Sequence, residues 1–279
     1  MLTIRKAAAL TGVPEHTLRA WERRYDLLHP ARTESGYRVY DDADVARITA
    51  MHQLVEAGWS PRAAATEVAR GRFGDGADPY AELIGAAGEL DADRVAREIG
   101  DRFARAPFEA VVDHWLMPAL AQLGRAWAAG TVSVAGEHLV ANAVSRQLYA
   151  IHDATPRRRG RNPVLVGTPP GVDHQLGLLA FAVAAVRAGV PTVYLGAQVP
   201  LDAWADGTAR LRPRFAVTNV PRRRDAAAAA RVVDLLASGP AVEIRLGGRH
   251  QRLVGEPGHQ LGHSIGAAAA RLATEVGPG

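Results

Sequence analysis

The stretch Val164-Leu-Val-Gly-Thr-Pro-Pro-Gly-Val-Asp-His-Gln-Leu-Gly177 decides the fold of the second half of this chain. Val164–Gly167 is a short apolar run typical of a buried strand, and the Gly/Pro-rich segment after it can continue neither a strand nor a helix. A run of helical length, 176–188, comes next. Strand, glycine-rich loop and helix in this order begin a parallel sheet, and ligands bind at this loop in such folds.

The pattern repeats downstream. Apolar runs typical of buried strands alternate with stretches long enough for helices; the expected strands are 191–196, 215–218 and 242–248, and the expected helices are 201–210 and 225–237. Such alternation predicts a doubly wound, Rossmann-like parallel sheet over residues 162–279.

Upstream, residues 79–153 are rich in Ala and Leu with helical periodicity, and we expect a four-helix bundle there. Trp127 ends one helix, and Ser133 caps a helix that begins at Val134. Glu137 and His138 follow on that helix, where adjacent side chains point about 100° apart and do not form an acid–base pair. Charged or Gly/Pro-rich linkers at 71–79 and 154–163 separate this bundle from its neighbours.

Residues 1–72 are basic and helical in pattern. Gly12 stops a first helix, and Pro14 suits the opening of a second, 15–25, on which Leu18 and Trp21 face the core while Arg19 and Arg23 share another face. A hairpin with Ser35-Gly36 at its turn follows and presents Arg32 and Arg38. A helix–turn–helix with such a charged face fits the major groove of double-stranded DNA.

The composition of the chain excludes several classes of protein. The chain has 279 residues, a formal net charge of +4 and no cysteine, which excludes disulfides, thiolate nucleophiles and Cys-based metal sites. It contains no apolar run near the roughly 20 residues that cross a bilayer and no secretory signal, so we expect no membrane partner and a cytoplasmic location. No nucleophile elbow or phosphate-binding P-loop is present, which favours a regulator over an enzyme.

The helix–turn–helix followed at once by Gly36-Tyr-Arg-Val-Tyr40 resembles the MerR family of winged-helix regulators, over residues 2 to about 69. The resemblance implies base reading by the second helix, backbone contacts by the wing, and dimers. The DNA-binding residues it implies, with Arg32 of the wing added, are His16, Arg19, Trp21, Arg23, Arg24, Arg32, Tyr37, Arg38 and Tyr40. We expect Trp21 to lie partly in the core.

The other two blocks resemble cobalamin-binding proteins. Trp127 followed by Glu137-His138 is similar to the Trp-x9-Glu-His signature of their helical caps, and His174-Gln-Leu-Gly177 is similar to their Asp/Glu-x-His-x-x-Gly motif. The resemblance implies that His174 is the lower axial ligand of cobalt. The implied cofactor-binding residues are Trp127, Val134, Glu137, His138, Gly171, Val172, Asp173, His174, Gly177, Thr218, Val220, Gly247 and Gly248.

The whole chain, with a DNA-binding head (residues 1–72), a helical bundle (79–153) and a parallel sheet (162–279), resembles the CarH/LitR family of photoreceptor repressors. The resemblance implies adenosylcobalamin, a homo-oligomer (dimer or tetramer) held on an operator, and release of DNA by light.

The chain departs from the family pattern at three places. Val172 stands where the motif has its acid, and losing such a partner of a metal ligand costs about 10–100-fold in affinity. We expect the side chain of the adjacent Asp173 to point elsewhere. Val220 shortens an expected Leu, and Ala128 replaces the His that follows the Trp in the photoreceptors, so a second axial His is missing there.

Other interpretations stay open at this point. The same cavity suits another tetrapyrrole, a haem or a bilin, or the domain binds no cofactor. Bundle plus sheet also resembles a corrinoid-dependent enzyme or methyl-carrier subunit, against which the DNA-binding head argues. His259 and His263 have the spacing of metal ligands on a helix, but nearby glycines favour surface histidines.

Overall fold

The computed structural model describes residues 2–25, 27–28, 30–32, 38–56, 61–68, 78–158, 162–239, 241–256 and 259–277, apart from a few side chains within these ranges. Two compact units result, Met1–Glu137 and His138–Gly279. The finer division into domains 1–72, 79–153 and 162–279 remains a prediction. In the described part of the chain, no helix is long and apolar enough to cross a membrane.

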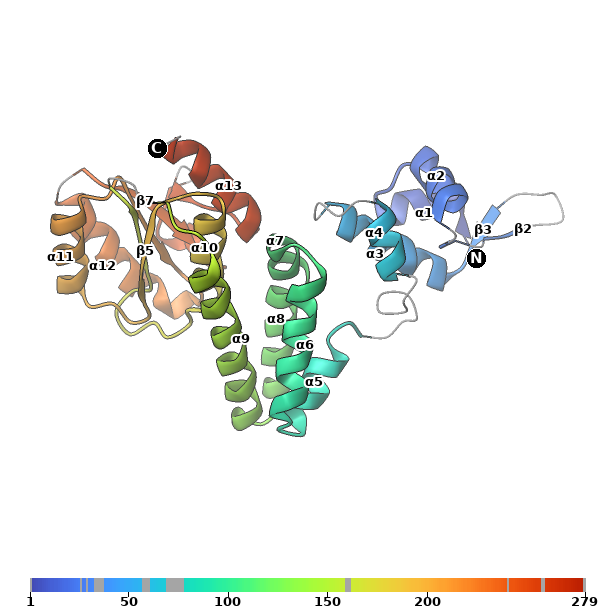
Figure 1. Cartoon of the computed structure of the whole chain (residues 1–279), viewed down its shortest axis with the longest axis horizontal. Coiled ribbons are helices and arrows are strands. Elements are labelled where there is room, and N and C mark those ends of the chain that lie inside the picture. The colour runs from blue at the N-terminus through green and yellow to red at the C-terminus, as the bar shows by residue number, and fades with distance from the viewer. Residues whose placement is uncertain are drawn as a thin grey trace. The chain divides into compact units, whose positions relative to one another are not determined.

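The N-terminal head is a helical domain with a small antiparallel sheet (Figure 1). Its elements are β1 (Leu2–Thr3), α1 (Ile4–Thr11), α2 (Glu15–Tyr25), β2 (Ala31–Arg32), β3 (Arg38–Tyr40), α3 (Asp42–Glu56) and α4 (Pro61–Glu67). The strand order is β1-β3-β2, with Ala31 opposite Val39, so the predicted hairpin exists. Its predicted turn, Ser35-Gly36, lies outside the described residues.

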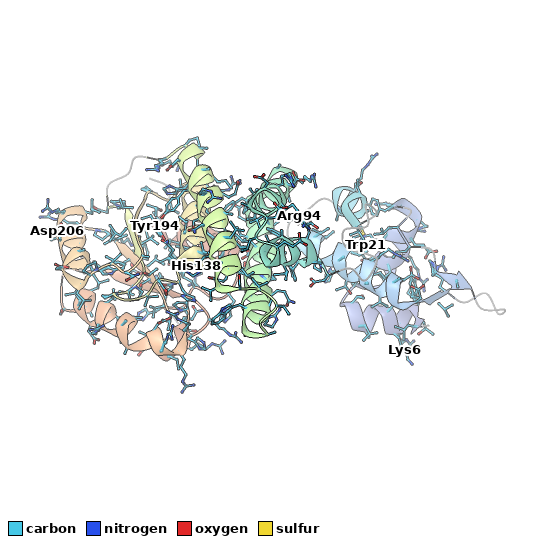
Figure 2. All side chains as sticks on the ribbon, turned by 90° about the horizontal axis from the view of Figure 1, so that it is seen from below. Lys6, Trp21, Arg94, His138, Tyr194 and Asp206 are labelled. Carbon is cyan, nitrogen blue, oxygen red and sulfur yellow. The ribbon has the colours of Figure 1, made fainter. Side chains whose placement is uncertain are left out.

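Local chemistry accounts for the helix–turn–helix. Gly12 ends α1 with a positive φ of 73°, which glycine adopts without steric cost, and its N–H bonds the Ala8 carbonyl at 2.9 Å. The carbonyl of Pro14 then accepts from Leu18 at 3.1 Å as α2 begins. Leu18 is fully buried in a core that also contains Ile48 and Met51 from α3. Lys6 lies on the outer surface of the head (Figure 2).

Four helical segments follow between residues 81 and 154. They are α5 (Ala81–Gly88), α6 (Ala92–Arg105), a rod made of α7 (Phe108–Val111), the π-helical turn η2 (Val112–Leu116) and α8 (Met117–Ala128), and α9 (Val134–Ala154). Asp91 caps α6 by accepting from Arg94 N–H at 3.0 Å. Gly136, near the start of α9, is buried against the carbonyl of Ala87 at the end of α5, which leaves no room for a Cβ, so a glycine is needed there.

The C-terminal unit contains a four-stranded, fully parallel sheet in the order β5-β4-β6-β7. Its elements are β4 (Val164–Gly167), α10 (Leu176–Arg187), β5 (Thr192–Gly196), α11 (Leu201–Leu211), β6 (Phe215–Asn219), η3 (Arg223–Asp225), α12 (Ala226–Ala237), β7 (Glu243–Gly247), η4 (Gln251–Leu253) and α13 (Ile265–Val276). Helix α10 packs against α13 and α11 against α12, on opposite faces of the sheet (Figure 1). The doubly wound sheet is therefore confirmed, with each expected strand and helix within two residues of its predicted bounds.

The strand order places a switch point between β4 and β6. From β4 the chain crosses to β5 on one side, and it then returns to β6 on the other. The loops that leave the carboxyl ends of β4 and β6 therefore turn away from each other, and such sheets bind ligands in the crevice between those loops. His174 lies on the first of the two loops.

Candidate functional site

Helix α2 presents the charged face that its sequence predicts. Leu18 and Trp21 are buried, whereas His16, Arg19, Arg23 and Arg24 are exposed. Arg19 is only loosely paired, at 3.5 Å from Glu15 on the same helix. These four side chains form one accessible surface on the second helix of the helix–turn–helix, where base and phosphate contacts are made.

Two of the predicted DNA contacts lie in the core of the head instead. Trp21 is 5% exposed and Tyr40 is fully buried. Their rings pack with Leu18 and Ile48, which explains why α2 and the wing keep a fixed geometry. The expected partial burial of Trp21 is thus exceeded, and a direct base or phosphate contact by either ring does not fit this burial.

The wing is joined to α2 by an ion pair. Arg38 donates from Nε to the Glu22 carboxylate at 2.7 Å, and this hydrogen bond raises the pKa of Arg38 above its ordinary value. Arg38 therefore fixes the wing against α2 as well as lying in the predicted phosphate-binding segment. Tyr37 and the side chain of Arg32, two further predicted contacts, lie outside the described residues.

The turn between α8 and α9 exposes two large apolar side chains. Trp127, at the end of α8, is 51% exposed, and Val134, at the start of α9, is 56% exposed. The Ser133 hydroxyl accepts from Gly136 N–H at 3.1 Å, which confirms the predicted cap. Glu137 is half-buried and His138 is exposed in the next positions of α9. An exposed indole in this place is available to cover an apolar ligand.

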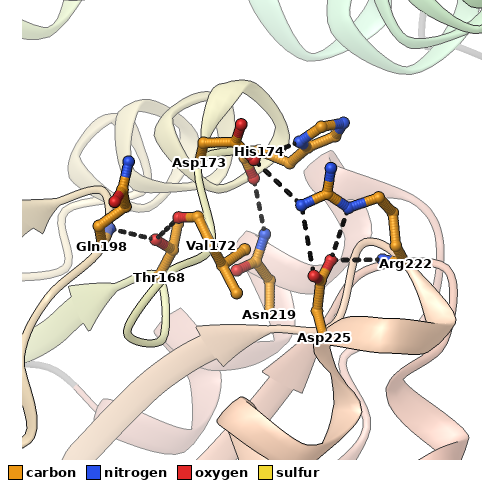
Figure 3. A network of polar contacts seen from close by, with 8 residues as sticks. All are labelled: Thr168, Val172, Asp173, His174, Gln198, Asn219, Arg222 and Asp225. Carbon is orange, nitrogen blue, oxygen red and sulfur yellow. Dashed lines mark hydrogen bonds and ion pairs between the residues drawn. The ribbon is translucent and has the colours of Figure 1, made fainter.

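At the carboxyl ends of the strands, on the loop after β4, the imidazole of His174 is hydrogen-bonded to the adjacent Asp173. Its Nδ1 lies 2.7 Å from Asp173 Oδ1 (Figure 3), and the hydrogen bond from His174 lowers the pKa of Asp173. The expectation that Asp173 points elsewhere is therefore wrong, because its carboxylate reaches the ring from the adjacent position. With Nδ1 donating to this carboxylate, the Nε2 lone pair remains for a metal ion.

The loop that carries His174 is fixed along its length. The Thr168 hydroxyl donates to the Val172 carbonyl at 2.5 Å and accepts from Gln198 N–H at 2.7 Å. Val172, in the motif's acid position, is 1% exposed and packs inward, so it takes no part in orienting the ring. Asn219, at the end of β6, donates to the His174 carbonyl at 3.1 Å. The loop thus presents His174 from a rigid base.

Residues of β6 and β7 complete the edge. The hydroxyl of Thr218 and the side-chain oxygen of Asn219 are buried and have no hydrogen-bond partner among the described residues. Gly248 has a φ of +88°, and a Cβ on it would lie 2.8 Å from the Val220 backbone. Val220 itself is fully buried. Leaving a buried polar atom unpaired costs about 1–3 kcal/mol, so these two atoms favour a polar ligand group beside Gly247 and Gly248.

Sequence reasoning missed the residues behind the His174 loop. Asn219, Arg222 and Asp225 all belong to β6 or the turn after it, and each contacts the His174 loop or supports a residue that does. The signal available was topological, because the segment Pro221-Arg-Arg-Arg-Asp225 follows the strand on the other side of the switch point.

His259 and His263 are both exposed. No group of three or more His, Asp or Glu side chains within the described ranges is placed to hold a metal ion. A metal that arrives inside a macrocycle needs only one protein ligand, and His174 offers one free nitrogen.

Comparison with known proteins gives matches along most of the chain. Residues 2–70 match the model of the MerR HTH family regulatory proteins, and residues 80–151 match a B12 binding domain. The HTH-type transcriptional repressor CarH of Myxococcus xanthus is 35% identical over 225 residues, which are 75% of each chain. The chain belongs to the CarH family of MerR-type repressors.

A second relative supports the same family. The HTH-type transcriptional repressor CarA of Myxococcus xanthus is 31% identical over 80% of this chain and 77% of its own. Among solved structures, the monomethylamine corrinoid protein of Methanosarcina barkeri covers 70% of this chain and 96% of its own, with a TM-score of 0.56 and 15% identity. That likeness concerns the fold alone.

The residues at the sheet edge fit the cobalamin that this family implies. His174 Nε2 would be open to cobalt, because Nδ1 is engaged by Asp173, and the unpartnered oxygens of Thr218 and Asn219 would suit polar groups of the cofactor. Beside them, Gly247 has no side chain, and a Cβ there would meet only the Thr218 carbonyl at 3.9 Å. The chain is thus a MerR-type DNA-binding regulator with a B12-binding domain.

Proposed function

We propose that this chain is a transcriptional repressor whose operator binding is controlled by adenosylcobalamin, bound through His174. The observation that carries the proposal is the imidazole at the switch point, with Nδ1 engaged by Asp173 and Nε2 left for cobalt. Its position on a braced loop gives the nitrogen a fixed direction, as a ligand to a bulky macrocycle requires.

Other residues of the chain would bind the rest of the cofactor. Thr218 and Asn219 bind polar groups of the cofactor tail, and Gly247, where a Cβ would meet only the Thr218 carbonyl at 3.9 Å, leaves room for it. Gly248 allows the Val220 backbone to pack closely against the residues after β7. Trp127 and Val134 supply apolar cover from the turn between α8 and α9, with Glu137 and His138 beside them. When bound, adenosylcobalamin supplies a cobalt–carbon bond that light can break.

The DNA contacts come from the head. His16, Arg19, Arg23 and Arg24 are accessible on α2 for the major groove, and the wing carries Arg38. We propose a homo-oligomer, because a single head that binds a short half-site gains affinity when it is linked to a second one. A repressor of chromosomal genes acts in the cytoplasm, which is the location we propose.

An enzymatic role has less support. CarH and CarA, which match most of the chain, are named as transcriptional repressors, and the monomethylamine corrinoid protein matches in fold alone. A methyl-carrier subunit also has no use for the exposed basic face of α2. We therefore propose that the domain senses cobalamin and does not transfer groups from it.

The absorption spectrum of the purified full-length chain tests the proposal. After incubation with adenosylcobalamin in the dark and gel filtration, the protein should keep corrinoid bands, and illumination should change them and release an operator fragment. His174→Ala should lower corrinoid affinity by at least the roughly 10–100-fold that losing a partner of a metal ligand typically costs. His263→Ala, which changes an exposed histidine of the same domain, should not.

The same spectrum separates the alternatives. A Soret band from haem, a bilin band, or no chromophore with unchanged operator binding would each overturn the cobalamin assignment. Corrinoid bands that respond to illumination without any change in operator affinity would remove light as the signal and leave the cofactor in place.

A further inference from the structure

The imidazole of His174 is the last of four connected side chains, and the first of them is a buried carboxylate from a different loop (Figure 3). Asp225 is 5% exposed and accepts from Arg222 at Nε (3.0 Å) and from its backbone N–H (3.0 Å). Arg222 donates from Nη2 to Asp173 Oδ1 at 3.0 Å. The same oxygen accepts from His174 Nδ1 at 2.7 Å.

This connection joins the two loops of the switch point. Asp173 and His174 lie on the loop after β4, whereas Arg222 and Asp225 lie in the turn after β6. Asn219, at the end of β6, makes a second link through the His174 carbonyl. The backbone and the side chain of His174 are thus both tied to the neighbouring strand.

Exposure decides what Arg222 contributes. The side chains of His174 and Asp173 are 52% and 61% exposed, and a contact between two such groups holds weakly in water. The side chain of Arg222 is 27% exposed and that of Asp225 is 6% exposed, so the anchor is firm at its inner end. A planar guanidinium that contacts both carboxylates fixes the direction of the outer one.

We propose that Arg222, anchored by Asp225, is a positioning residue for the His174 imidazole. Through Asp173 it does the work of the acid that the family motif has at the place of Val172. The contact selects the imidazole tautomer with hydrogen on Nδ1 and keeps Nε2 directed away from the carboxylate. The inference rests on the proposed role of His174 as the cobalt ligand.

The first test uses the protein without corrinoid. In the full-length chain labelled with ¹⁵N-histidine, at a pH where the imidazole is neutral, the ¹⁵N shifts of His174 should report the Nδ1–H tautomer. His174→Ala identifies the signal. Arg222→Ala should shift the tautomer populations toward the Nε2–H form, which a histidine side chain free in water prefers. Arg222→Lys keeps the charge without the planar guanidinium, and its tautomer populations should lie between those of the wild-type chain and Arg222→Ala. Arg224→Ala, an exposed arginine of the same turn, is the matched control and should leave the shifts unchanged.

The second test adds cob(II)alamin and measures its affinity and its electron paramagnetic resonance spectrum. The wild-type chain labelled with ¹⁵N-histidine should show the two-line superhyperfine splitting of a ¹⁵N ligand, which distinguishes His174 from the cofactor's own ¹⁴N base. Arg222→Ala should lose about 10-fold in affinity and part of this splitting, in line with other partners of metal ligands. Asp225→Asn, which weakens the anchor without touching Asp173, should have a smaller effect in the same direction.

The two tests separate this inference from the proposed function. Wild-type ¹⁵N shifts and wild-type affinity in a folded Arg222→Ala or Arg222→Lys chain would overturn the role of Arg222 alone. A tautomer that depends on Arg222 in a chain that takes up no corrinoid would support the positioning contact and overturn the proposed function.

Discussion

At the scale of single residues, Asp173 shows how a motif can change position and keep its chemistry. The family motif has its acid two residues before the histidine, where this chain has the buried Val172. The adjacent Asp173 nevertheless reaches Nδ1 at 2.7 Å. Because the loop has no regular secondary structure here, neighbouring side chains need not point to opposite sides as they would on a strand. If His174 binds cobalt as proposed, Asp173 should offset the cost in metal affinity expected from Val172.

Arg19 should be a direct DNA contact. We expect Arg19→Ala to weaken operator binding by about 1–3 kcal/mol if it reads a base, or to lower the salt dependence by about one charge if it binds phosphate. Electrophoretic or fluorescence titration at several salt concentrations measures both. Corrinoid uptake should stay the same, and Arg210→Ala, which removes an exposed arginine of α11, serves as control. Unchanged affinity and salt slope would remove Arg19 from the interface.

Gly248 should be intolerant of a side chain. Its positive φ costs an L-residue about 1–2 kcal/mol, and crowding against the Val220 backbone should add about 1–3 kcal/mol. Gly262 has a φ of +87° but nothing within 4 Å of its missing Cβ, so Gly262→Ala should bear only the conformational cost. Urea denaturation of the two alanine variants compares them, and equal losses of unfolding free energy would contradict the close approach.

At the scale of elements, ion pairs join segments that are distant in sequence. Arg38 of β3 pairs with Glu22 of α2, and Arg245 of β7 pairs with Glu275 of α13 at 2.9 Å. Arg245 is 8% exposed and also lies over the ring of Phe215, 4.9 Å from its centroid. A buried arginine needs such partners, so the last helix is fixed to the edge strand by charge as well as by packing.

The ion pairs at β7 predict a dependence of stability on pH. Burial of Glu243 alone would raise its pKa, but hydrogen bonds from Arg245 and Arg214 outweigh this and lower the pKa. A carboxylate with a lowered pKa stabilises the fold at neutral pH, and the contribution is lost as the pH falls from about 5 through the lowered value. Glu243→Gln should cost about 0.2–1 kcal/mol at neutral pH and flatten this decline. Denaturation curves at several pH values test it, and parallel declines in both proteins would refute it.

At the scale of the whole molecule, affinity for DNA should depend on how many heads are linked. If adenosylcobalamin assembles the chain, operator affinity should rise by about 10²–10⁴-fold over that of one head, without new contacts at the DNA. Light scattering and operator titration of the full-length chain, with and without adenosylcobalamin in the dark, measure mass and affinity together. A mass that stays constant while affinity changes would contradict assembly as the cause.

The sequence by itself determined the element types and their faces. Short continuous apolar runs, separated by stretches of helical length, predicted every strand of the parallel sheet. Parallel strands are buried on both faces and therefore need continuous apolar residues. The spacing of Leu18 and Trp21 predicted that they lie on the buried face of α2, and it predicted that Arg19 and Arg23 lie on the exposed face. His174 was proposed as a ligand because the loop after the first strand is where such folds bind ligands, and the structure places it on that loop. These features depend on local periodicity and on chain order, which a sequence displays directly.

Only the tertiary structure decided which side chains complete the site. Arg222 lies 49 residues after Asp173, and nothing in the spacing relates them until the strand order sets β6 beside β4. The same holds for Tyr40, whose place in a wing motif predicted exposure while packing against α3 buried it. Contacts of this kind depend on which elements become neighbours. Which elements become neighbours depends on how all of them together bury their apolar faces, so no single segment of the sequence determines it.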